Sequence, residues 1–323
     1  MAQVAGTTDT FDLIGIAEDV EELINNISPT ETPAYTMAKR VKATNTLHQW
    51  QTDSLAAAGA NLAVEGDDST YATASPTTML SNYTQILKKT VMVSGTADAV
   101  RKYGRKEEFG YQMMKRGKEL KLDIEFAMVQ NQGSSAGSTS VARSSASLES
   151  MISGNRIFAG STNSVGTTAG YAAGVWTAPV DGTTAALTET AVVAALTAAW
   201  TDGGDPSILM MNSGPKRALA AFGGASKFAG VSVNQGRTSQ AVVLGGVDLY
   251  ISDFGEHKVV LNRHMRSRTL FALDPDYISW AVLRPIRFEE RAKTGDATRG
   301  ELLTEGCLVV GNPNAHAKVQ DIT

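Results

Sequence analysis

The spacing of apolar and polar positions along the chain predicts a few helices and a larger number of short strands. Apolar residues that recur every three or four positions are typical of amphipathic helices. On this basis the sequence predicts helices over 12–27, 104–131, 187–203 and 214–222. In the first helix the apolar positions are Ile16, Val20, Leu23 and Ile27, and the outward positions are Glu18, Asp19, Glu21 and Glu22.

The helix predicted over 104–131 is the longest in the sequence. At 1.5 Å per residue it would be roughly 40 Å long, about twice the radius of gyration expected for a compact domain of this size. A helix of this length is typical of a structural spine. Its apolar face is formed by Phe109, Met113, Leu120, Ile124 and Met128. We interpret these methionines as packing residues and not as cofactor ligands.

Alternating apolar and polar positions predict strands over 46–55 and 80–95, and a short buried strand over 207–211. About 24 weakly patterned residues lie between the first two strands. Because a connection of that length is unusual inside a compact domain, we interpret the pair as a long projecting hairpin. Further strands are predicted over 241–244, 247–252, 258–262, 269–273, 278–283 and 301–310. Helices and strands do not alternate regularly, so the predicted fold class is α+β and not a doubly wound sheet.

The composition suggests that stability depends on backbone pairing and on neighbouring molecules. Of the 323 residues 42% are hydrophobic, but only 7% are aromatic, and Ala, Gly, Ser and Thr are abundant. Small side chains bury little area each, at roughly 25 cal/mol per Å². Residues 132–147 are especially rich in Ser and Gly, which predicts a mobile loop.

The charge balance argues against a dedicated duplex-binding domain. The net charge is −4 and the pI is about 5.7, whereas phosphate neutralisation normally requires a basic protein surface. The N-terminal residues have no basic region followed by an apolar run, so no secretory signal is predicted. No apolar run approaches the roughly 20 residues that span a bilayer. We therefore expect no membrane association and a protein made in a cytoplasm, unless it leaves inside a larger particle.

Motifs of catalysis and of metal or cofactor binding are nearly absent. The chain lacks GxGxxG, GxxxxGK[ST] and HExxH, and the four histidines, at positions 48, 257, 264 and 316, are not spaced as a metal pair. A GxSxG pattern centred on Ser135 follows a helix, whereas a nucleophile elbow needs a strand before it. A serine hydrolase is thus only a distant alternative. The single cysteine, Cys307, excludes an intrachain disulfide and predicts a small buried side chain in a strand.

Two charged clusters remain as candidate binding residues. The acidic cluster lies in the projecting hairpin and consists of Glu65, Asp67 and Asp68; it is either a solvated loop or a site for a hard cation. The basic cluster lies in or before the longest helix and consists of Arg101, Lys102, Arg105, Lys106, Lys115, Arg116, Lys118 and Lys121. The basic cluster has three interpretations: a solvated helix face, a nucleic-acid site, or a contact for an acidic segment of another subunit.

Several stretches, taken in order, resemble one protein family. They are Ile27-Ser28-Pro29, Thr32-Pro33, the run from Leu47 to Asp53, the run from Lys89 to Thr96, Lys118-Glu119-Leu120, Asp123-Ile124-Glu125, Ser252-Asp253-Phe254-Gly255, Asn262-Arg263, Arg284-Pro285 and Lys293-Thr294-Gly295-Asp296. This order resembles the major capsid proteins of tailed bacteriophages with the Hong Kong 97-like fold, in their SU-ten-type branch. The resemblance covers nearly the whole chain and is weakest over 132–180.

The resemblance implies a domain plan and a function. Residues 1–45 would be an N-terminal arm and 46–95 an extended loop. Residues 96–184, with the spine helix, and 275–323 would form a peripheral domain, and residues 185–274 an axial domain. The function would be self-assembly, as pentamers and hexamers, into the icosahedral head around double-stranded DNA. Portal, scaffolding and decoration proteins would be further partners, assembly would take place in the host cytoplasm, and an encapsulin-like shell is the nearest alternative.

Two hypotheses concern contacts within such a shell. Glu65, Asp67 and Asp68 would dock on basic residues of a neighbouring subunit, with Arg101, Arg105 and Lys118 as the candidates. Each exposed pair would contribute only about 0–1 kcal/mol, so its effect would be on register more than on affinity. The inner surface would be neutral or acidic, because packaged DNA must slide and leave.

Overall fold

The computed structural model describes residues 28–56, 58–66, 68, 71, 73–74, 76–159, 170–222 and 248–323. The helix predicted over 12–27 and the strand predicted over 241–244 lie outside these residues. The helices are α1 (Pro33–Met37), α2 (Gly95–Ala99), α3 (Glu108–Val129), α4 (Leu148–Met151), α5 (Glu189–Thr201) and α6 (Ser213–Ala221). The strands are β1 (Lys39–Lys42), β2 (Leu47–Thr52), β3 (Thr78–Tyr83), β4 (Gln85–Ser94), β5 (Arg156–Phe158), β6 (Gly170–Ala172), β7 (Val175–Thr177), β8 (Ile208–Met211), β9 (Leu249–Ser252), β10 (Gly255–Leu261), β11 (Leu270–Leu273), β12 (Ile278–Arg291), β13 (Ala297–Val310) and β14 (Ala317–Gln320).

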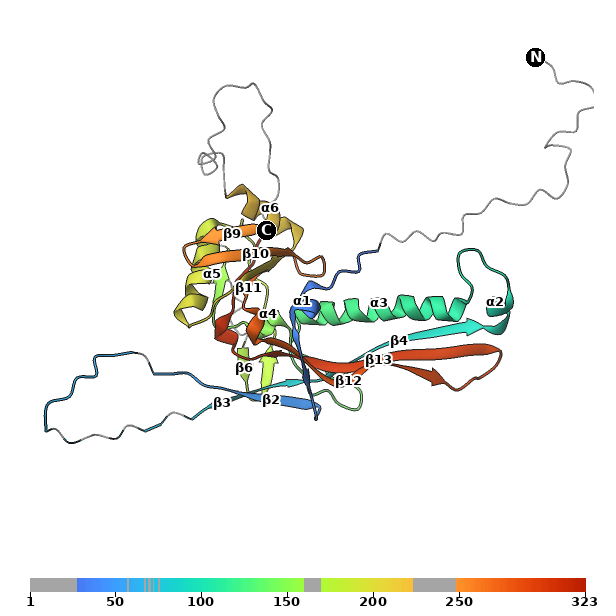
Figure 1. Cartoon of the computed structure of the whole chain (residues 1–323), viewed down its shortest axis with the longest axis horizontal. Coiled ribbons are helices and arrows are strands. Elements are labelled where there is room, and N and C mark those ends of the chain that lie inside the picture. Colours follow the sequence, from blue (N-terminus) through green and yellow to red (C-terminus); the bar gives the residue numbers. More distant parts are fainter. Residues whose placement is uncertain are drawn as a thin grey trace, which may run out of the picture.

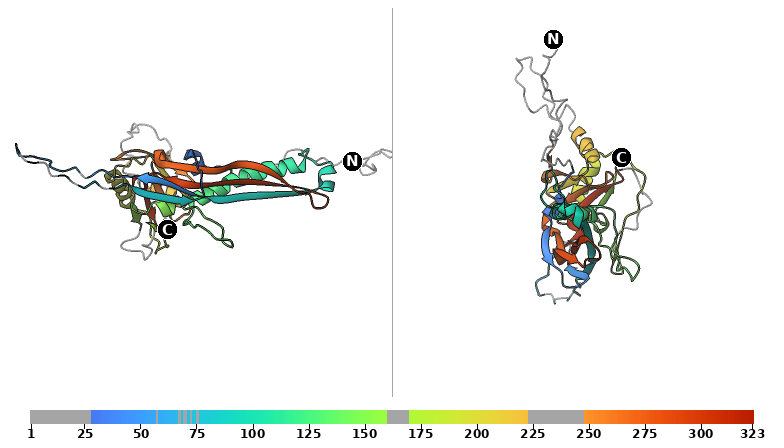
Figure 2. Two further views of the ribbon diagram at one scale, coloured as in Figure 1. Left: turned by 90° about the horizontal axis from the view of Figure 1, so that it is seen from below. Right: turned by 90° about the vertical axis from the view of Figure 1, so that its right-hand side faces the viewer.

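One half of the molecule is a long four-stranded sheet with α3 lying along one face (Figure 1). The strand order is β1-β12-β13-β4, and the antiparallel pair β12–β13 supplies two strands of 14 residues each. Gly300 in β13 lets the helix approach, because a Cβ at that position would collide with the rings of Phe288 and Phe109. The sheet and helix together form the elongated half of the molecule (Figure 2).

The long helix predicted over 104–131 is confirmed in type and is shorter at both ends. It has 22 residues, which corresponds to about 33 Å. It begins at Glu108 because Asp98 of α2 accepts a hydrogen bond from the Glu108 backbone N–H at 3.0 Å. That bond satisfies one of the free donors at the helix N-terminus.

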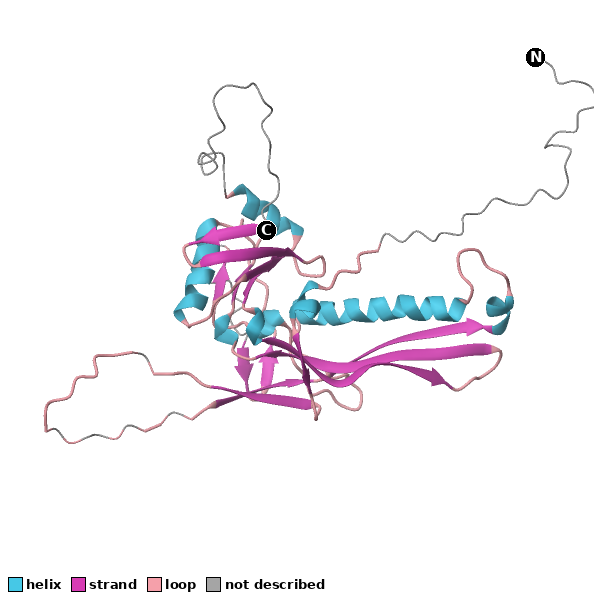
Figure 3. Cartoon of the chain, viewed as in Figure 1, coloured by secondary structure: helices cyan, strands magenta, loops and turns pink. Residues whose placement is uncertain are grey.

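The strand predicted over 80–95 is two strands with different partners, and this corrects the single strand expected. β3 pairs antiparallel with β2, from Leu47 opposite Tyr83 to Thr52 opposite Thr78. β4 instead pairs antiparallel with β13. The break falls at Thr84, whose backbone N–H donates to Thr46 O at 2.8 Å and whose hydroxyl donates to Glu305 at 2.9 Å. The hairpin β2–β3 nevertheless projects from the body, as predicted (Figure 3).

The other half of the molecule is a six-stranded mixed sheet in the order β5-β14-β11-β8-β10-β9. Helices α5 and α6 pack against it through an apolar cluster that includes Val192, Leu196 and Leu219. β14 lies between β5 and β11, so the end of the chain returns to this sheet after the long hairpin β12–β13. A second apolar cluster joins both halves, with Met210 and Phe271 from one sheet and Trp280 and Leu308 from the other.

The two ends of the segment 132–147 pack against the body, whereas its middle, residues 138–142, is exposed. The mobility that its composition predicts stays a prediction. Ser145 and Ser147 are buried, and Ser135 forms a β-bridge with Ser144. The side chain of Asn82 donates to Leu308 O at 2.7 Å and accepts from the Ala146 N–H at 2.9 Å. Small side chains permit this close approach of backbone to backbone at both ends of the segment.

Candidate functional site

Nothing in the described part of the chain forms a catalytic or metal centre. The hydroxyl of Ser135 accepts a hydrogen bond from the Gly137 N–H at 3.2 Å and lies in a bridged loop, not in a strand-to-helix elbow. His257 is buried between Ser252 and the carbonyl of Pro206. No three His, Cys, Asp or Glu side chains come together as metal ligands among the described residues. In the same residues no helix is long and apolar enough to cross a membrane.

The candidate site is therefore a surface, and its most exposed part is the connection between β2 and β3. Its described residues, from Asp53 to Thr77, form no helix or strand. Large apolar side chains in this connection face solvent, with Leu55 98% and Tyr71 97% exposed. Glu65 and Asp68 are exposed as well, whereas Asp67 lies outside the described residues. A monomer gains nothing from exposing such side chains, so this connection has the character of a docking element.

The predicted basic partners lie in different environments. Arg101 is exposed in the turn between α2 and α3, and Lys118 is exposed on α3. Arg105 is already paired within the chain, because its guanidinium donates to Glu108 and lies 5.5 Å from the centre of the Tyr111 ring. Hydrogen bonds from Gln112 and Arg105 lower the pKa of the Glu108 carboxyl.

The acidic and basic candidates do not meet within one molecule. The connection between β2 and β3 projects from one end of the molecule, and α2 with the start of α3 lies at the other end (Figures 1 and 2). A contact between Glu65 or Asp68 and Arg101 therefore requires two copies of the chain. The sequence identified both clusters and left their positions in space open.

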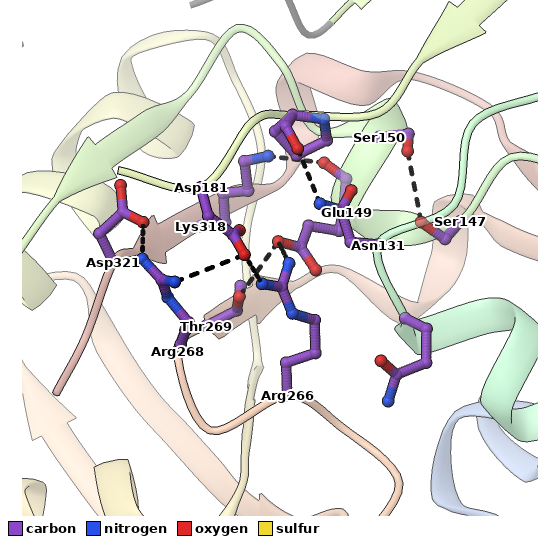
Figure 4. Close-up of polar contacts among 12 residues, drawn as sticks. Asn131, Ser147, Glu149, Ser150, Asp181, Arg266, Arg268, Thr269, Lys318 and Asp321 are labelled. Carbon is purple, nitrogen blue, oxygen red and sulfur yellow. Dashed lines mark hydrogen bonds and ion pairs between the residues drawn. The ribbon is translucent and has the colours of Figure 1, made fainter. Parts of the chain in front are cut away.

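The structure also contains a buried ionic cluster that sequence reasoning missed (Figure 4). Arg266 donates to Glu149 at 2.8 Å and also binds Asp181, and Arg268 binds Asp321 at 2.9 Å. The ammonium of Lys318, which is fully buried in β14, donates to the Glu149 carbonyl oxygen at 2.6 Å. Burial raises the pKa of Glu149 and lowers that of Lys318 to about 8. The cluster fastens α4 and the segment around Asp181 to the six-stranded sheet. A single lysine inside the apolar strand at 317–320 was its one signal in the sequence.

A second buried carboxylate fixes the start of the described chain. Glu125 of α3 is fully buried and accepts hydrogen bonds from the backbone N–H groups of Ala34 at 2.9 Å and Tyr35 at 2.6 Å. The Asn262 amide donates to the same carboxylate at 2.5 Å. Burial raises the pKa of Glu125. One side chain thus holds α1, α3 and the turn after β10 together.

The fold built from these parts is that of the Hong Kong 97-like phage capsid proteins. The capsid subunit of cyanophage A-1(L) superposes with a TM-score of 0.62 over 98% of both chains, at 14% identity. The capsid of the native GTA particle gives a TM-score of 0.60 over 95% of this chain and 96% of that one, at 11% identity. The major capsid protein of Phage G, solved with its decoration protein, gives 0.54 over 100% of both, at 11% identity.

The sequence itself assigns the family. The model of the SU10 major capsid protein matches residues 3–323. The major capsid protein of Escherichia phage Phieco32 is 42% identical over 110 residues, which are 34% of this chain and 31% of that relative. The chain belongs to the SU10 major capsid protein family. This is a family of structural proteins, which removes the serine hydrolase alternative and confirms that the chain is not an enzyme.

Proposed function

We propose that this chain is the major capsid protein of a tailed phage and assembles into the icosahedral head that encloses double-stranded DNA. The observation that carries the proposal is the projecting connection between β2 and β3, in which Leu55 and Tyr71 are almost wholly exposed. Side chains of this kind are stabilised only when another molecule covers them. The partner expected for a protein of this family is a neighbouring copy of the chain. The protein would assemble in the host cytoplasm and would then form part of the virion capsid.

The proposed domain plan divides the chain by residue ranges, and each of the two large sheets joins strands from more than one range. Residues 1–45 would be the arm, and the hairpin within 46–95 the extended loop. The peripheral domain, 96–184 and 275–323, would contain α3 with β12 and β13, which pair with β1 of the arm and β4 of the extended loop in the four-stranded sheet. The axial domain, 185–274, would contain β8 to β11 of the six-stranded sheet. Within this plan β14 belongs to the axial sheet by its pairing with β5 and β11, so the last strand of the chain would tie the two domains together.

The extended loop would dock on the next subunit mainly through its apolar residues. Leu55, Leu62, Val64 and Tyr71 are all exposed, and complete burial of such a side chain contributes about 1.5–3 kcal/mol. The charged residues Glu65, Asp67 and Asp68 would set the register against Arg101 and Arg105 or Lys118 of the neighbour, at about 0–1 kcal/mol for each exposed pair. Arg101 and Lys118 are both exposed, whereas Arg105 is already engaged by Glu108.

Expression of the chain followed by electron microscopy tests the shell function. We expect closed particles or sheets, alone or with a scaffolding protein. A chain that stays monomeric in both conditions would overturn the proposal. An encapsulin-like shell would instead form closed particles that enclose a protein cargo and exclude DNA. A particle map in which the tip at 65–68 lies more than about 8 Å from every basic group would reject the charge contact, since that is the Debye length at physiological salt.

The remaining partners are proposed from the function. The packaged duplex would be held without sequence-specific contacts, in keeping with the net charge of −4. The inner surface would be neutral or acidic, and a map with Lys and Arg dominating that surface would contradict this. Portal and scaffolding proteins would direct assembly, and a decoration protein would bind the outer surface. Co-purification with particles made in the natural host tests each of them.

A further inference from the structure

The outer face of α3, which points away from the four-stranded sheet, carries an unpartnered basic stripe. We define this outer stripe as Met114, Lys115, Lys118, Lys121 and Phe126. All five are exposed, with Met114 at 68% and Phe126 at 53%. None of the three lysines forms an ion pair or hydrogen bond with any described residue, whereas Arg116 on the same helix is paired with Glu119. The stripe thus combines positive charge with exposed apolar surface.

The outer stripe continues the face of α3 that α1 already covers. Positions 114, 118, 121 and 125 follow one another at helical spacing, so they lie on one side of the helix. At position 125 the carboxylate of Glu125 holds the first turn of α1. The chain before α1, residues 28–32, leaves on the side of α3 away from the sheet (Figure 1). The chain that follows the N-terminal segment is therefore anchored at the end of the stripe, through Ala34 and Tyr35.

The composition of that N-terminal segment is complementary to the stripe. Residues 1–31 contain no Lys or Arg, and the first basic residue of the chain is Lys39. The segment carries these seven carboxylates: Asp9, Asp12, Glu18, Asp19, Glu21, Glu22 and Glu31. The pattern over 12–27 also predicts an apolar face. The segment therefore offers carboxylates to the lysines of the outer stripe and an apolar face to Met114 and Phe126.

The distances allow this contact within one chain. Lys118 is seven residues from Glu125, or about 10 Å along the helix, and Lys115 is about 15 Å from it. Glu18 is sixteen residues before Ala34, which the Glu125 carboxylate holds, and a chain of that length reaches about 24 Å as a helix or up to about 53 Å when extended. The cluster at 18–22 can therefore reach the lysines whether the segment is helical or extended.

We propose that the acidic N-terminal segment of this chain, residues 12–27, lies along the outer stripe of its own α3. Its carboxylates pair with Lys115, Lys118 and Lys121, and its apolar face covers Met114 and Phe126. The contact is a property of the subunit itself and does not depend on shell formation. Lys118 would then be occupied by the arm, which leaves Arg101 as the cation for the loop tip of a neighbour.

Amine labelling of the unassembled, DNA-free full chain tests the contact. Mass spectrometry would follow acetylation of each lysine in the natural chain and in the variant E18Q/D19N/E21Q/E22Q. We expect several-fold faster labelling of Lys115, Lys118 and Lys121 in the variant, and no change at Lys88 on β4, which is exposed and serves as the internal control. Equal rates in both chains would overturn the proposal.

A matched variant identifies a different occupant. E65Q/D67N/D68N removes acidic groups in the same way from the loop tip. Faster labelling of the stripe in this variant, and not in the arm variant, would assign the stripe to the loop tip and overturn the proposal. Protection that appears only after a duplex oligonucleotide is added would assign the stripe to DNA, with the same consequence.

Carbodiimide cross-linking of the natural chain needs no variant and so is independent of any folding defect. We expect amide bonds between the three lysines and the carboxylates at 18–22. Mixing subunits of ordinary and heavy isotopic composition distinguishes the source of the arm. Cross-links within chains of one composition support the proposal, and cross-links between the two compositions would place the arm on a neighbour and overturn it. Particle formation is scored separately, so failure of the shell function would leave this result intact.

Discussion

Two segments that are rich in small residues and lack a regular apolar pattern lie in different environments in this molecule. The connection between β2 and β3 projects away from the body with its apolar side chains in solvent. Residues 132–147 are even richer in Ser and Gly, yet their two ends are held against the core. The Trp176 backbone N–H donates to the Ser134 hydroxyl at 2.7 Å, and the Asn82 side chain accepts from the Ala146 N–H at 2.9 Å. The difference lies in what the rest of the chain offers each segment. The ends of the second segment meet the buried Asn82 side chain and the backbone of Trp176, whereas Leu55 and Tyr71 of the first stay in solvent. The comparison teaches that exposure here depends on the available partner and not on composition.

Replacing the buried indole of Trp176 gives the largest expected effect. Trp176 is 2% exposed, and its ring nitrogen donates to Ser81 O at 2.8 Å. Trp176→Ala should lower the free energy of unfolding by about 3–5 kcal/mol, because it removes this bond and leaves a cavity. Urea unfolding followed by circular dichroism measures the loss, and Trp176→Phe should lose less. A loss below about 1 kcal/mol would contradict the packing role of the ring.

Lowering the pH should destabilise the folded chain through its buried histidine. His316 is fully buried, and its Nδ1 accepts a hydrogen bond from the Asp274 N–H at 3.1 Å. Burial lowers the pKa of His316 from 6.5 to about 4. Its folded pKa lies below the unfolded one, so the stability it contributes is present above pH 6.5 and is lost as the pH falls toward 4.

The loss between those two pH values should be about 3 kcal/mol. Unfolding free energies measured across this window for the natural chain and for His316→Gln isolate the effect, because all other groups are shared. We expect the two curves to converge as the pH falls. Parallel curves would mean that His316 titrates normally.

Removing the polar anchor of the packed segment should have an intermediate effect. Asn82 accepts from the Ala146 N–H and donates to Leu308 O, and all of these groups are buried. Asn82→Ala leaves them unsatisfied, and we expect a loss of about 2 kcal/mol in the free energy of unfolding. Hydrogen exchange should then show faster exchange at 144–147. Unchanged exchange there would contradict the role of Asn82.

The smallest effect on the subunit is expected in the projecting connection. Leu55→Ser and Tyr71→Ser should change the free energy of unfolding by no more than about 0.5 kcal/mol, because both side chains are already in solvent. Particle yield should nevertheless fall, since these side chains are the proposed contact with the next subunit. Asn61→Ser, in the same connection, is the control and should leave yield and stability unchanged. Normal yield in the Leu55 and Tyr71 variants would transfer the docking role to the charged tip.

Much of the secondary structure could be predicted from the local spacing of apolar residues. The helices at 108–129, 189–201 and 213–221 and the strands at 47–52, 208–211 and 270–273 match the predicted periodicity closely. Local periodicity reflects which face of an element is buried, and that information is present in consecutive residues. The break at Thr84 was missed because both strands have the same alternation, and only their partners differ. The buried ionic cluster around Glu149 was missed because its members come from segments far apart in the chain.

The sequence by itself determined the fold class, the long helix, the projecting hairpin and the family, since all of these depend on local spacing and on the order of short stretches. Only the tertiary structure decided which strands pair, that both ends of 132–147 are packed, that Arg105 is already engaged, and that the acidic tip and the basic helix lie at opposite ends of the molecule. The physical reason is that pairing, burial and ion pairs depend on groups brought together from distant positions. A linear pattern records what each segment can bury and leaves open which segment covers it.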